Sequence, residues 1–122
     1  MLVIIRLVAF VLFAALTHAP AGRAQSMPPW RTCPDPDGVD GYAQQSADTA
    51  DGRESTARVL KNCGFAWMDK SEWKLAIRFF SLSIEKNPGA DDTYYGRALA
   101  REKIGDKAGA EIDLAMSRSI AR

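Results

Sequence analysis

The side chains that most often carry out catalysis are scarce in this sequence of 122 residues. Its single histidine, His18, lies in an apolar N-terminal segment, so the rest of the chain has no Ser-His or Cys-His pair. Carboxylate pairs occur at Asp91 and Asp92 and at Asp35 and Asp37. The first pair opens a predicted helix, where acidic side chains favour the helix dipole, and the second lies in a proline-rich stretch. We therefore predict no catalytic residues, no cofactor and no enzymatic activity.

The two cysteines, Cys33 and Cys63, are the other side chains capable of chemistry. Two thiols are too few for a structural zinc site, which takes four ligands, so we predict no metal site. In an exported chain an even pair of cysteines favours a disulfide. A bridge that closes about thirty residues would stabilise the fold by roughly 3 to 4 kcal/mol. The alternative is two reduced cysteines that are buried as small apolar side chains.

The N-terminal segment has the pattern of a secretory signal peptide. Arg6 precedes an uncharged run over residues 7–16, and small residues suited to cleavage follow it. We expect residues 1–24 to be removed by a cut after Ala24, and the mature chain to be exported to the periplasm or secreted. The alternative is an uncleaved membrane anchor, for which the apolar run is short because a span needs about 20 residues. Only in that case would the chain associate with a membrane.

The mature chain would be almost neutral. Cleavage takes Arg6 and Arg23 from the 16 basic side chains and leaves all 15 acidic ones, so the net charge becomes −1. A protein with this charge has no strong positive field, and we expect no nucleic-acid partner.

Two regions follow the expected signal peptide. Residues 25–54 are rich in proline, aspartate and glycine, and we expect them to be mostly irregular. From Ser55 onward, apolar and small residues recur at steps of three and four, which predicts two amphipathic helices joined by a polar turn. Pro88 cannot continue a helix and ends the second one. The recurring residues are Leu60, Cys63, Gly64 and Trp67, then Trp73, Ala76, Ile77, Phe80 and Ile84.

This pattern repeats after 34 residues, which is the tetratricopeptide period. Laying residues 57–90 over residues 91–122 aligns Ala76 with Ala110 and places Gly64 over the small Ala98. The run YYGRALAREKIGD resembles the YYxRGxAxxxxGD motif of small exported bacterial tetratricopeptide repeat (TPR) proteins. The matching residues are Leu60, Cys63, Gly64, Trp67, Trp73, Ala76, Phe80 and Pro88 in the first copy, and Tyr94, Ala98, Gly105, Ala110 and Leu114 in the second.

The resemblance implies an all-α fold of two helix-turn-helix hairpins, a short α-solenoid, over residues 55–122. Its repeats would span about 57–90 and 91–122, with small residues where the helices approach closely and Gly105 in a turn. The sequence departs from the family pattern at four positions. Arg101 and Lys107 stand where aromatic residues are usual, and Ser83 and Ser117 stand where alanine is preferred.

Two such hairpins do not bury their own apolar faces, because about three stacked repeats are usually needed for stability. The missing cover could come from a second copy in a homodimer, from another protein, or from the N-terminal segment. A bridge between Cys33 and Cys63 would hold residues 25–50 over the first repeat.

In this family the first helix of each repeat lines a concave groove that takes peptides or helices. Matched position by position, the groove residues are Arg58, Lys61, Asn62, Phe65, Met68, Tyr95, Leu99 and Glu102. Its basic edge would suit an acidic and apolar peptide, and the alternative is an ordinary solvated helix face. The family's carboxylate clamp is not predicted, since Lys61 is its only matching residue.

We therefore expect an exported interaction module, an adaptor or assembly factor that binds a protein or peptide partner. The alternative function is that of a structural envelope protein that self-associates through the open end of its repeat stack.

Overall fold

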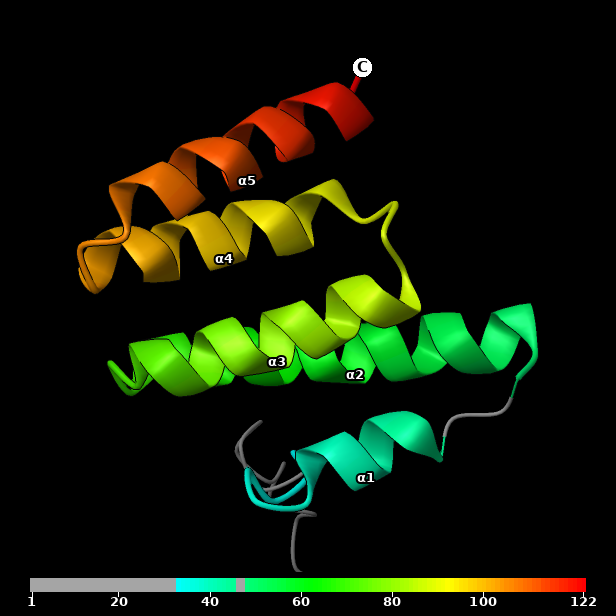
Figure 1. Cartoon of the computed structure of the whole chain (residues 1–122). Coiled ribbons are helices and arrows are strands. Elements are labelled where there is room, and N and C mark those ends of the chain that lie inside the picture. The colour runs from blue at the N-terminus through cyan, green and yellow to red at the C-terminus, as the bar shows by residue number, and fades with distance from the viewer. Residues whose placement is uncertain (1–32, 46–47) are drawn as a thin grey trace, which may run out of the picture.

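The computed structural model describes residues 33–45 and 48–122. The predicted signal peptide, its cleavage site after Ala24 and the start of the proline-rich segment lie outside these residues. All regular secondary structure in the described residues is helical, as expected, and it forms five helices that are stacked in layers (Figure 1).

The first two helices begin earlier than the sequence pattern indicates. Helix α1 spans Val39–Gln44 and α2 spans Ala50–Asp69, so parts of the segment expected to be mostly irregular are helical. The side chain of Thr49 accepts a hydrogen bond from the N–H of Gly52 at 3.1 Å and caps α2. This cap satisfies a free N–H of the first turn, which explains why α2 starts five residues before Ser55.

Helix α3 spans Trp73–Lys86 and packs against α2 in an antiparallel pair (Figure 1). The sharp turn between the two helices includes Ser71, whose φ of 60° is in the left-handed region. Gly64 makes the close approach possible. A Cβ atom at this position would lie 2.6 Å from the Phe80 ring, so the predicted need for a small residue is confirmed.

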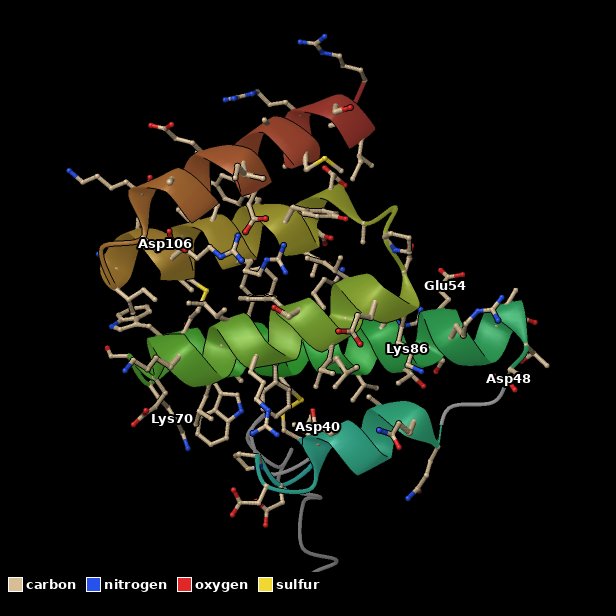
Figure 2. The ribbon with its side chains drawn as sticks, viewed as in Figure 1. Asp40, Asp48, Glu54, Lys70, Lys86 and Asp106 are labelled. Atoms are coloured by element: carbon tan, nitrogen blue, oxygen red, sulfur yellow. A yellow bond between two sulfur atoms is a disulfide. The ribbon has the colours of Figure 1, made fainter. Side chains whose placement is uncertain are left out.

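Helices α4 (Asp91–Lys103) and α5 (Lys107–Ile120) form the second antiparallel pair. Gly105 has a φ of +84° in the connecting turn, as its predicted role requires, because a left-handed residue is least strained as glycine. Asp106 then caps α5 by accepting a hydrogen bond from the N–H of Gly109 at 2.9 Å. Asp106 is labelled at this turn in Figure 2.

The two pairs share an interface between α3 and α4. Ala76, Phe80 and Ala100 form one buried cluster there, with Phe65 and Met68 packed against it. Ser83, which stands where the tetratricopeptide pattern has alanine, is also buried, and its hydroxyl donates to the Ala57 carbonyl at 2.7 Å. The buried hydroxyl is therefore satisfied, which accounts for a serine at a core position.

Residues 33–44 fold back over the first pair. Cys33 and Cys63 form a disulfide, so the predicted bridge is confirmed and the alternative of two reduced cysteines is wrong. Val39 and Ala43 of α1 are buried in one cluster with Leu60, Cys63 and Phe79. Asp40 also pairs with Arg78 of α3 at 2.6 Å, and Figure 2 shows it beside α3. The chain itself therefore covers part of the apolar surface that two hairpins would leave exposed.

Candidate functional site

The predicted groove residues come from two helices that contact each other, α2 and α4. The Lys61 Nζ lies 2.6 Å from a carboxylate oxygen of Asp92, and Phe65 lies against the backbone of Gly96. These contacts align the two helices side by side. We call the eight predicted residues on them the α2/α4 surface.

Each of the eight residues is accessible to a partner. Arg58, Asn62, Tyr95 and Glu102 are exposed, while Lys61, Phe65, Met68 and Leu99 are half-buried. Tyr95 is 50% exposed, an unusual position for a large aromatic side chain. On α2 the residues recur at steps of three and four, and on α4 they do the same, so each helix contributes a single stripe.

Phe65 has a structural role in addition to its place on this surface. Its ring makes an edge-to-face contact with Phe80, with ring centroids 4.9 Å apart and an interplanar angle of 76°. A Cβ atom on Gly96 would come within 2.9 Å of the same ring. Removing Phe65 would therefore open the core as well as the surface, and Tyr95 is the better position at which to test binding.

The charge of the surface differs from the basic edge expected from Arg58 and Lys61. Lys61 is paired with Asp92, which offsets its positive charge. Arg58 has no ion pair with any residue that the structure describes. The basic character of this edge therefore rests on Arg58 alone, and Glu102 adds a negative charge at the other end.

A pocket of about 90 Å³ extends the surface beyond Arg58 and Lys61. Its other walls come from the end of α3 and the start of α4, and its lining includes Ala57, Ser83, Asn87 and Thr93. A second pocket of about 230 Å³ lies close by, lined in part by Glu54 and Lys86, both of which are labelled in Figure 2. The two hollows offer space for side chains of a bound peptide at this end of the surface.

A buried ion-pair network on α4 and α5 was missed by the sequence analysis. Asp113 is 1% exposed and accepts hydrogen bonds from Arg97 at 2.8 and 2.9 Å and from Arg101 at 2.8 Å. Arg97 also donates to the Ser81 hydroxyl of α3 at 3.0 Å. Arg101, which replaces an aromatic residue of the family pattern, was the one sequence signal for this network.

The carboxylate pairs considered for catalysis have local structural partners. Asp92 binds Lys61, and a carboxylate oxygen of Asp35 accepts from the N–H of Asp37 at 3.1 Å. Over residues 33–45 and 48–122, no three or more His, Cys, Asp or Glu side chains are grouped so that they could hold a metal ion. The same stretches contain no helix long and apolar enough to cross a membrane.

Comparisons with family models, curated proteins and solved structures found no match for this chain. The assignment of function therefore depends on the geometry of the α2/α4 surface and on the sequence pattern.

Proposed function

We propose that this protein is an exported interaction module of the tetratricopeptide type, which binds an extended peptide or a helix on the α2/α4 surface and has no catalysis of its own. The observation that carries the proposal is the side-by-side arrangement of α2 and α4, with eight accessible residues in one stripe on each helix.

The tetratricopeptide assignment is supported by the spacing of the helix ends. Helix α4 ends at Lys103, 34 positions after α2 ends at Asp69. Helix α5 begins at Lys107 and ends at Ile120, each 34 positions after the corresponding end of α3. The small residues that correspond between the pairs are also buried, namely Gly64, Ala76, Ala98 and Ala110. A repeat of one structural unit accounts for both observations.

Export is supported by the disulfide between Cys33 and Cys63, because such bonds persist in oxidising compartments. The apolar segment at residues 7–16, with Arg6 before it, is the sequence feature that would direct export. Together they favour the periplasm or the extracellular space.

The chemistry of the surface suits a peptide with apolar side chains and charges of both signs. Tyr95, Met68 and Leu99 offer aromatic and aliphatic contacts, and tyrosine is enriched at positions that dominate binding energy. Because Asp92 offsets the charge of Lys61, an acidic peptide gains less than the sequence alone suggested. An acidic side chain of the partner would pair with Arg58.

The proposal can be tested with peptides selected from a random library on the oxidised protein. We expect Tyr95→Ala and Arg58→Glu each to raise the Kd of a selected peptide about tenfold or more, as for loss of an interface anchor. Lys74→Glu is the matched control, since it makes the same charge change at an exposed position of α3. Isothermal titration calorimetry gives the Kd, and circular dichroism checks the fold of each variant.

The proposal is supported if the two surface variants weaken peptide binding and Lys74→Glu does not. A selected peptide that binds both surface variants as tightly as the wild type would place binding elsewhere and overturn the proposal. Equal weakening by Arg58→Glu and Lys74→Glu would show a general charge effect, and it would also count against the α2/α4 surface.

A further inference from the structure

Helix α5 has an apolar face that no described residue covers. Ile112 is 64% exposed and Met116 is 41% exposed, whereas the opposite side of the helix buries Ala110 and Asp113 against α4. Exposed large aliphatic side chains that are close together indicate an interaction site. We call the residues of this face, Ala108, Ile112, Ala115, Met116 and Ser119, the α5 outer face.

The spacing on this face is that of a helix-pairing seam. Ala108, Ile112, Ala115 and Ser119 are separated by four, three and four residues, which is the a/d spacing of a coiled coil. Three of the four are small, so a second helix could approach closely. The face therefore fits another α-helix better than an extended chain.

Two charged residues at the edge of the seam indicate which helix binds there. Glu111 and Arg118 are seven residues apart, so they lie on the same flank of α5, and both are exposed. Neither takes part in an ion pair within the described residues. When a second copy of α5 lies antiparallel, this flank meets the same flank of that copy. The negative charge of each copy then lies beside the positive charge of the other.

We propose that the α5 outer face binds the α5 outer face of a second copy in an antiparallel, twofold-symmetric dimer. A twofold axis perpendicular to the helices places Glu111 of each copy beside Arg118 of the other, and Ile112 of each copy against Ala115 of the other. A parallel pairing would leave the same two charges without partners. The self-complementary charges therefore favour a second copy, and the antiparallel orientation.

The dimer would be weak but would matter for binding. Helix α5 has 14 residues and is about 21 Å long, so it offers a small contact area. Interfaces below about 1,200 Å² are typical of weak complexes. The α2/α4 surfaces lie on other helices and stay free, so the dimer would present two of them and bind multivalent partners more tightly. Self-association through α5 does not require a peptide on the α2/α4 surface.

The test is a charge-reversal experiment followed by sedimentation velocity on the oxidised protein, up to high micromolar concentration. We expect the wild type to form dimers, and Glu111→Arg and Arg118→Glu each to weaken self-association about tenfold or more, because like charges then meet twice. An equimolar mixture of the two variants should form a mixed dimer, since every pair across the interface is again opposite in charge.

The mixed dimer and two further variants distinguish this interface from other causes of association. Glu85→Arg, which reverses an exposed charge on α3, is the matched control and should dimerise like the wild type. Ile112→Glu should abolish the dimer without affecting the fold, because Ile112 is largely exposed. A wild type that stays monomeric, single variants that self-associate like the wild type, or variants that do not pair with each other would each overturn the proposal.

Discussion

At the scale of single residues, the most consequential side chain is Asp113. It is buried between α4 and α5, and its carboxylate is held by two arginines of α4, one of which binds through two hydrogen bonds. A buried ion pair does not necessarily stabilise a fold more than apolar packing would, but breaking one leaves an uncompensated charge. Loss of the Asp113 carboxylate would therefore leave partly buried guanidinium charge between α4 and α5.

We predict that Asp113→Ala lowers the free energy of unfolding by about 3 kcal/mol, because Arg97 would be left partly buried without its counter-charge and Arg101 would keep only the longer ion pair with Asp106 at 3.6 Å. Urea denaturation followed by circular dichroism measures this change.

The control is Asp106→Ala, which removes an exposed carboxylate that caps α5 and makes only a long ion pair with Arg101, at 3.6 Å. Loss of a helix cap costs about 0.5 to 2 kcal/mol. Equal destabilisation by the two substitutions would mean that the Asp113 network has no special role.

At the scale of the elements, α1 depends on tertiary contacts because it is only six residues long. Isolated helices of this length are unstable in water. Three contacts hold α1 in place: the disulfide just before it, the burial of Val39 and Ala43, and the ion pair between Asp40 and Arg78. The disulfide is the covalent link among the three contacts and should contribute most.

We predict that the double change Cys33→Ala and Cys63→Ala lowers the free energy of unfolding by roughly 3 to 4 kcal/mol, as loop closure over 30 residues implies. Amide hydrogen exchange should also show that α1 loses protection first, while α2 and α3 stay protected.

Arg78→Ala serves as the comparison, because an exposed ion pair contributes about 1 kcal/mol or less. If α1 kept its protection without the disulfide, the apolar cluster and the ion pair would be enough to hold α1 in place.

At the scale of the whole molecule, the two helix pairs are connected by one buried cluster. Phe80 of α3 and Ala100 of α4 belong to it, and the Arg97–Ser81 hydrogen bond joins the same two helices. Two helix pairs that share a strong interface unfold as one unit when each pair is unstable alone.

We predict a single cooperative unfolding transition. Tryptophan fluorescence in a Trp30→Phe background reports on the first pair through Trp67 and Trp73, while far-ultraviolet circular dichroism reports on every helix. The two signals should give the same midpoint in urea.

Asp113→Ala provides the sharper form of the test. Asp113 lies in the second pair, whereas the fluorescence signal reports on the first. Asp113→Ala should nevertheless shift the urea midpoint of the fluorescence signal by as much as it shifts the midpoint of the circular dichroism signal. Separate midpoints would show that the pairs unfold independently.

Much of the helical arrangement could be read from local pattern. The steps of three and four predicted α2 and α3, and Gly64, Ala76 and Gly105 had their expected positions because these constraints arise within a helix or a turn. The early start of α2 was missed even though Thr49 is a good capping residue, since Gly52 and the polar residues around it weakened the helical pattern.

The sequence by itself determined that the chain is helical and that α3 ends before Pro88, because these features follow from periodicity and from the backbone of proline. The residues of the α2/α4 surface came from the resemblance to the tetratricopeptide pattern. Only the tertiary structure decided how charges and faces are paired. The partners of Asp113, the neutralising contact of Asp92 with Lys61, and the burial of Phe79 beneath α1 join residues on different helices. Such contacts depend on the packing of distant segments, and local spacing carries no information about them.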